Sequence, residues 1–345
     1  MVLRDVKPPT AEEIAASTPW RPAGIKHRKN EAFVDVIETV VATFDPDGTL
    51  SLSLLFFSPY HFIMDLGQVR HAEVHGKIMC RTFLSGMPEC RIALNDIAPV
   101  LQSTTTPLSP TSSRDSIGLT GMDTGSLANP ADTPPTGFVV LRDTQYHQCV
   151  RFTQDDHEQQ QQQQQRTISF IPPDGEFQLL RYRVTSRLRL PFQAKITTTP
   201  LGTTRLRVSM TLISAFPSVL EATHIRVNIP VPNSTAQVKV DMATPASGKA
   251  KYVPLEEAIV WTLAKLPGEA QVGMQAVVTV ASSHNASRPL WTKPPVSIQF
   301  HILMLTASGL MVRYLKVQEA RQGYASVKWV RYSTQSDGGY QWMYT

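Results

Sequence analysis

Hydrophobic and polar residues alternate in short runs along the chain from Glu31 onward, and Pro, Gly and Asn separate these runs. Successive side chains of a β-strand point to opposite faces, so this alternation predicts strands with one buried face. The clearest case is residues 224–231, where Ile225, Val227, Ile229 and Val231 share one face. Further strands are predicted at residues 74–84, 150–153, 167–171, 179–184, 205–213, 272–281, 296–305 and 310–317.

Many short strands with few helical repeats predict an all-β fold of antiparallel sandwich type. Residues 254–266 could instead form a helix, although the Ile259-Val260-Trp261 run within them also fits a strand. Three segments are predicted by composition to lie outside the folded part. These are the Pro- and Ala-containing tail at residues 1–24, the Ser-, Thr- and Pro-rich loop at 103–137, and the glutamine-rich loop at 155–165.

The composition is ordinary for a folded protein, with 42% hydrophobic and 18% charged residues. A net charge of +5 suits an anionic membrane surface at least as well as nucleic acid, and without an Arg-rich arm or a row of stacking aromatic residues we expect no nucleic-acid partner. Three cysteines, Cys80, Cys90 and Cys149, cannot pair completely, and the first residues lack the apolar core of a signal peptide. These features predict a reduced, cytosolic setting.

Enzyme signatures are missing from the sequence. Gly248-Lys249 does not belong to a P-loop, because Ala243 stands where the first glycine is required. The His157-Glu158 pair has no second histidine four residues on, and there is no G-x-S-x-G motif. We therefore predict a protein that is not an enzyme and that binds no cofactor and no metal.

Two short segments far apart in the sequence carry the chemistry of a binding site. Phe33 and Asp35 fall on one face of a predicted strand near the start, and Trp329 and Arg331 on one face of another near the end. Side by side, these strands would offer a carboxylate, a guanidinium and an aromatic wall, next to an apolar dent. Such a site suits a tyrosine ring held by its hydroxyl, together with a neighbouring hydrophobic side chain.

Six segments, in order along the chain, resemble the mu homology domain of clathrin-adaptor medium chains. They are residues 20–31 (WRPAGIKHRKNE), 33–38 (FVDVIE), 83–91 (FLSGMPECR), 169–177 (SFIPPDGEF), 308–317 (SGLMVRYLKV) and 328–332 (KWVRY). Residues 147–151, 180–183 and 190–192 are most similar to the endocytic, plasma-membrane type. Thr334-Gln335 is instead similar to the trans-Golgi type, which is the alternative.

The resemblance implies an elongated, immunoglobulin-like β-sandwich of two subdomains, the second inserted in the first. We place the first at residues 25–186 plus 305–345 and the second at 187–304. The amino-terminal longin-like domain of the family has no counterpart here, so we interpret the chain as a fragment or a truncated gene model. Residues 49–67 also have no counterpart, and they are interpreted as a retained intron, with a lineage-specific loop as the alternative.

The resemblance also implies that the site binds peptides of the form Tyr-x-x-hydrophobic as an added strand. By position, the tyrosine pocket consists of Phe33, Asp35, Arg81, Trp329 and Arg331. Asp35 would accept the phenol hydrogen bond, and Arg331 would stack on the ring and keep Asp35 ionised. The hydrophobic pocket consists of Val34, Val312, Leu315 and Val330, and Ala32 in place of a larger aliphatic residue would leave it roomier.

Lys249 and Lys251 match a basic patch that contacts phosphoinositides in the endocytic members, although Val253 and Thr262 replace lysines of that patch. The expected partners are therefore Tyr-x-x-hydrophobic cargo tails, the other adaptor-complex subunits and an anionic phosphoinositide membrane surface. The expected location is cytoplasmic and peripheral to the membrane, at clathrin-coated pits and vesicles. A third possibility is an endocytic scaffold of the muniscin or stonin type, which uses the fold without a tyrosine pocket.

Overall fold

The computed structural model describes residues 18–46, 68–97, 137–151, 167–242, 248–281, 291–319 and 323–344. Their regular structure consists of strands and one 3-10 helix, η4 (Pro254–Glu256), so the predicted all-β class is confirmed. In this described part, no helix has the length and apolar character needed to cross a membrane. The suspected insert at 49–67, residues 1–17 of the tail and nearly all of the loops at 103–137 and 155–165 lie outside the described residues. Residues 18–24 of the predicted tail are described and pack on the folded part, because Arg21 is 1% exposed and donates to the carbonyls of Gly86, Pro172 and Leu84.

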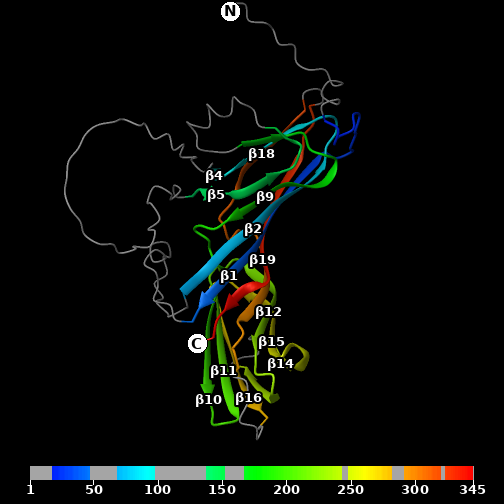
Figure 1. Cartoon of the computed structure of the whole chain (residues 1–345). Helices are drawn as coiled ribbons and strands as arrows, with labels where there is room; N and C mark the ends of the chain where they lie inside the picture. The colour runs from blue at the N-terminus through cyan, green and yellow to red at the C-terminus, as the bar shows by residue number, and fades with distance from the viewer. Residues whose placement is uncertain are drawn as a thin grey trace, which may run out of the picture.

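One nine-stranded sheet extends through the molecule in the order β14-β15-β12-β17-β19-β1-β2-β9-β6. In chain order its strands are β1 (Glu31–Asp45), β2 (Gln68–Phe83), β6 (Arg142–Tyr146), β9 (Gly175–Val184), β12 (Glu221–Pro230), β14 (Lys249–Val253), β15 (Ala258–Pro267), β17 (Val296–Leu303) and β19 (Val327–Trp342). Figure 1 shows an elongated body in which β1 and β19 lie between the strands of the upper and lower parts.

Two four-stranded sheets complete the sandwich. One has the order β18-β3-β8-β7 and the other β10-β11-β16-β13, and β4 and β5 form a small separate pair. Their strands are β3 (Glu89–Leu94), β4 (Asp96–Ile97), β5 (Val139–Val140), β7 (Val150–Arg151), β8 (Thr167–Phe170), β10 (Phe192–Pro200), β11 (Arg205–Ser214), β13 (Thr235–Met242), β16 (Gln271–Val280) and β18 (Val312–Gln318). The division into two subdomains at the residues given above remains a prediction.

Burial alternates along the strands as the sequence indicates. In β1 the even-numbered side chains are buried and the odd-numbered ones are partly exposed, over all 15 residues. Ile225, Val227, Ile229 and Val231 are buried, with exposed fractions of 2% or less, as their alternation predicts. The inward side chains of the three large sheets form one hydrophobic cluster. The other face of each strand therefore carries the side chains that are available to a ligand.

Two expectations need correction. The sandwich is not purely antiparallel, because β1 pairs with β19 in parallel. The chain forms the strands β2 to β18 between them and then returns, which is the long crossover that parallel neighbours need. Residues 254–266 do not form a helix, since η4 covers only Pro254–Glu256 and β15 follows, with Ile259 and Trp261 in the core.

Candidate functional site

The two chemistry-bearing segments lie side by side on β1 and β19. In the parallel ladder, Phe33 is opposite Trp329 and Asp35 is opposite Arg331. On the other side of β1, Arg81 of β2 is opposite Phe33. Directly paired residues project from the same face of a sheet, so the structure brings all five predicted residues together on one face. We call Phe33, Asp35, Arg81, Trp329 and Arg331 the tyrosine cluster.

Asp35 and Arg331 form a bidentate ion pair at the centre of this cluster. The Arg331 Nε donates to Asp35 Oδ1 at 2.7 Å, and Nη2 donates to Oδ2 at 2.7 Å. The hydrogen bond and the charge of Asp35 raise the pKa of Arg331 above its ordinary value. Each carboxylate oxygen has a second acceptor site beyond the bond to Arg331. Asp35 can therefore accept a hydrogen bond from a ligand hydroxyl while the ion pair stays intact.

Aromatic surface flanks the ion pair. Trp329 is 57% exposed, which is unusual for a large apolar side chain in a folded domain. The Arg81 guanidinium carbon lies 4.9 Å from the centre of the Phe33 ring, within the range of a cation–π contact. This contact holds Arg81 beside the cluster and leaves the Trp329 indole available to a ligand ring.

One edge of β19 is open beside the tyrosine cluster. The ladder with β17 extends along β19 only as far as the pair Leu303 and Ser333. Beyond it the chain leaves for β18, and residues 327–332 then pair with β1 alone. No other strand in the described part of the chain pairs with this stretch of β19.

The backbone of this stretch is directed for strand addition. The Val327 N–H donates on the β1 side at 2.9 Å, whereas the Tyr332 C=O accepts from the Met304 N–H on the other side at 2.8 Å. In a parallel ladder, successive residues direct their N–H and C=O groups alternately to the two neighbours. Lys328 and Val330 therefore present their backbone groups at the open edge.

The four residues of the predicted hydrophobic pocket come from both layers of the sandwich. Val34 and Val330 are paired on β1 and β19, while Val312 and Leu315 belong to β18 of the facing sheet. Val34 is 2% exposed and lies inside the core, and the other three are partly buried and packed against it. Val34 therefore lies beneath the pocket, and the accessible apolar surface is provided by Val312, Leu315 and Val330.

Two features of this region escape sequence patterns. Met79 of β2 is opposite Asp35 and projects from the same face of the sheet. Its position two residues before Arg81 could have indicated this, because residues i and i+2 of a strand share a face. The open edge of β19 gives no sequence signal, since it depends on where β17 ends.

Lys249 and Lys251 are exposed at the far edge of the nine-stranded sheet. They are two residues apart on β14 and therefore share a face. A cavity of about 620 Å³ is lined by both lysines, and its apolar lining includes Val240, Met242 and Ala250. The two predicted residues thus lie together, and this apolar cavity beside them was not predicted.

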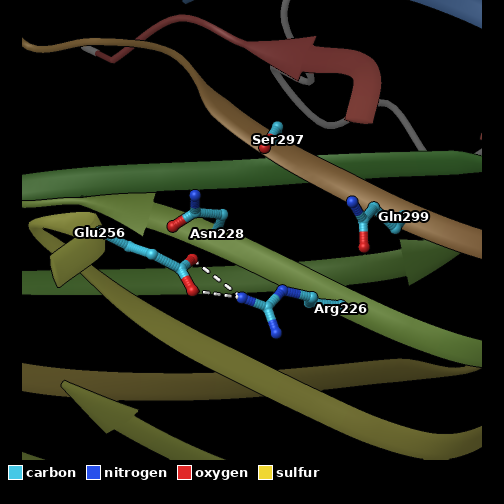
Figure 2. A pocket seen from close by; sticks show the side chains of 5 residues that line it. All are labelled: Arg226, Asn228, Glu256, Ser297 and Gln299. Carbon is cyan, nitrogen blue, oxygen red and sulfur yellow. Dashed lines mark hydrogen bonds and ion pairs between the residues drawn. The ribbon is translucent and has the colours of Figure 1, made fainter. Parts of the chain in front are cut away.

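A second, polar recess of about 400 Å³ lies on the outer face of β12 and β17. Figure 2 shows Glu256 of η4 reaching Arg226 of β12, whose Nη2 donates to both carboxylate oxygens at 2.7 and 2.8 Å. Asn228, Ser297 and Gln299 complete the lining. No sequence pattern predicted this recess, because its polar residues come from three elements that are separate in the sequence.

Comparisons with known proteins agree on the family. The model of the adaptor complexes medium subunit family matches residues 61–343. The AP-2 complex subunit mu of Dictyostelium discoideum is 35% identical over 329 residues, which cover 95% of this chain and 64% of the relative. The AP-2 complex subunit mu of Schizosaccharomyces pombe is 33% identical over 331 residues, which cover 95% and 63%. The chain thus spans just under two thirds of the length of these relatives.

A solved structure agrees on the fold. The Fcho1 mu homology domain of Danio rerio, solved with a bound Eps15 peptide, has a TM-score of 0.55 at 13% identity. The similarity covers 92% of this chain and 98% of that domain, so the predicted mu homology fold is confirmed. This chain therefore belongs to the adaptor complexes medium subunit family and contains its mu homology domain.

Proposed function

We propose that this chain recognises Tyr-x-x-hydrophobic sorting signals in the tails of membrane proteins. The observation that carries the proposal is the bidentate Asp35–Arg331 pair beside the open edge of β19. A peptide added to that edge gains main-chain hydrogen bonds, and its alternate side chains reach the surface next to the strand. The tyrosine would lie over Trp329, with its hydroxyl donating to Asp35.

The choice of tyrosine follows from the charges in the cluster. The carboxylate of Asp35 would lie next to the hydroxyl end of the tyrosine ring. Arg331 already donates to both oxygens of this carboxylate. A phenol hydroxyl can donate to this carboxylate without displacing the guanidinium. A phosphate group would instead bring about −1.5 to −2 charges against it.

The hydrophobic residue would enter the apolar surface of Val312, Leu315 and Val330. These residues are partly buried against the core, so an added apolar side chain would lose further contact with water. One short strand with two anchoring side chains buries little surface, so we expect an affinity on the order of micromolar.

The cellular role follows by analogy with the family. We propose that the chain acts within an adaptor complex at clathrin-coated pits, on the cytoplasmic side of the membrane. Lys249 and Lys251 would contribute a contact with phosphoinositide headgroups, and each lysine near an anionic membrane contributes about 1 kcal/mol. The trans-Golgi type and the non-cargo scaffold remain the alternatives, and the second would lack peptide binding at the tyrosine cluster.

The direct test is a titration of a Tyr-x-x-Leu peptide into the whole chain and into Asp35→Ala. Loss of the charged acceptor should weaken binding by about 1.5–3 kcal/mol, which is roughly ten- to hundredfold. The matched control is Asp241→Ala. Asp241 is an exposed aspartate of β13, in the four-stranded sheet β10-β11-β16-β13. Equal affinity of wild type and Asp35→Ala for the peptide would show that the tyrosine cluster does not bind the tyrosine of the signal.

A further inference from the structure

A buried carboxylate, Glu38, lies in the middle of β1, on the face opposite the tyrosine cluster. Glu38 is 0% exposed, and the other inward side chains of β1 around it are apolar. A buried carboxylate is costly unless it is hydrogen-bonded. Its partners therefore indicate what it holds in place.

The main partner of Glu38 is Ser308, in the connection between β17 and β18. The Ser308 N–H donates to Glu38 Oε2 at 3.0 Å, and the Ser308 hydroxyl donates to Oε1. The same hydroxyl accepts from the Leu310 N–H at 3.0 Å. Two hydrogen bonds thus tie Ser308 to one side chain of β1, 270 positions away in the sequence, and a third ties Leu310 to Ser308.

This connection leads directly into the proposed hydrophobic pocket. Immediately after it, the Met311 N–H donates to Asn95 Oδ1 at 2.6 Å and the Val312 N–H to the Tyr332 hydroxyl at 3.1 Å. Val312 is the first residue of β18 and one of the pocket residues. The position of residues 308–310 therefore sets where β18 begins relative to β19.

We infer that Glu38 is a positioning residue for the hydrophobic pocket, an inference that rests on the proposed function. Glu38 touches no part of the ligand. It fixes the Ser308 turn, and the turn fixes the distance between Val312 of β18 and Val330 of β19. Glu38 thereby determines which side chain fits the hydrophobic position of the signal.

The hydrogen-bond pattern predicts which substitution Glu38 tolerates. Oε2 accepts from the Ser308 backbone N–H, whereas Oε1 accepts from the hydroxyls of Ser308 and Tyr182. A hydroxyl can accept as well as donate. In Glu38→Gln the amide oxygen can take the position of Oε2 and the amide nitrogen can donate to both hydroxyls. Glu38→Ala removes all of these bonds.

The test compares two ratios of peptide affinity in wild type, Glu38→Ala and Glu38→Gln. The first ratio, Tyr-x-x-Leu over Tyr-x-x-Ala, reports the hydrophobic pocket and should be about tenfold or more in wild type. The second, Tyr-x-x-Leu over Phe-x-x-Leu, reports Asp35. In Glu38→Ala the first ratio should fall to about threefold or less while the second stays unchanged, and Glu38→Gln should restore the first.

A purely structural role makes a different prediction. A folding defect lowers the melting temperature and the active fraction, but it leaves both ratios at their wild-type values. Tyr340→Phe is the matched control, because it removes a buried hydroxyl that donates to the Phe192 carbonyl and not to Glu38. Unchanged ratios in Glu38→Ala would overturn the inference. If that variant does not fold, Ser308→Ala takes its place with the same expectations.

Hydrogen exchange separates this inference from the proposed function. If wild type binds no peptide, the proposed function fails. Hydrogen exchange of the Ser308, Leu310 and Val312 amides then tests on its own whether Glu38 positions the turn and the start of β18. Faster exchange of all three amides in Glu38→Ala, restored in Glu38→Gln, supports it. Protection of Val312 that is unchanged in Glu38→Ala overturns it, because the turn would then not position β18.

Discussion

The ring of Tyr182 occupies the space directly over Gly76. Gly76 of β2 is paired with Glu38 of β1 on one side and with Tyr182 of β9 on the other. A Cβ atom at position 76 would overlap the ring of Tyr182. The glycine therefore allows the ring to cross β2, so that the hydroxyl reaches Glu38 Oε1 at 2.9 Å.

Gly76→Ala should destabilise the fold by about 1–3 kcal/mol, because the new methyl group forces the Tyr182 ring away from Glu38. Gly273→Ala is the matched control in β16, since a Cβ there meets only the Met210 carbonyl oxygen at 3.6 Å and the Thr211 hydroxyl at 3.9 Å. Chemical unfolding of both variants measures the difference. Equal stabilities would show that the close packing at Gly76 carries no energetic weight.

Burial raises the pKa of Glu38 above its ordinary value near 4.5, against the opposing effect of its hydrogen bonds with Ser308 and Tyr182. Between the unfolded and folded pKa values the folded state holds a proton that the unfolded state has lost. The free energy of unfolding should therefore fall as pH rises through this window. Glu38→Gln should remove that part of the pH dependence, as urea unfolding between about pH 4.5 and 8 can show. Parallel pH profiles for wild type and variant would contradict this.

The residues between β1 and β2 should be largely dispensable. Asp45 and Gln68 are paired across the β1–β2 ladder, so deletion of residues 49–67 leaves Pro46-Asp47-Gly48 between them. This sequence suits a three-residue hairpin loop, with glycine at the left-handed position. Deletion also removes the apolar run Leu54-Leu55-Phe56-Phe57, an aggregation risk. The shortened chain should be more soluble and melt no lower. Failure to fold would mean that the segment is an integral part of the domain.

Ala32 should influence which hydrophobic side chain is preferred. It is 2% exposed and two residues before Val34, hence on the same inward face of β1. A small residue here should favour bulky side chains, so Tyr-x-x-Phe should bind at least as tightly as Tyr-x-x-Val. Ala32→Leu adds volume to this part of the core and should reverse the order, at a cost of about 1–3 kcal/mol in stability. An order that is the same in both proteins would separate position 32 from the pocket.

The strands and the tyrosine cluster could be predicted because both depend on local parity. Residues i and i+2 of a strand share a face, so Phe33 with Asp35 and Trp329 with Arg331 were expected together once their strands were neighbours. The parallel pairing of β1 with β19 was not expected, because it depends on the course of all the strands between them. The same holds for the crossing of Tyr182 over Gly76, since no spacing in the sequence indicates contacts across three strands.

The most direct test of the account is the ranking of three peptides that differ only at the tyrosine. Tyr-x-x-Leu should bind well above Phe-x-x-Leu, because phenylalanine buries Asp35 without its hydroxyl donor, at a cost of about 1–3 kcal/mol. The phosphotyrosine peptide should show no measurable binding, because its charge is opposed by Asp35. Calorimetric titration of the whole chain with each peptide gives the ranking. A phosphotyrosine peptide that binds as tightly as the unmodified one would contradict the account, because Arg81 and Arg331, not Asp35, would then dominate the site.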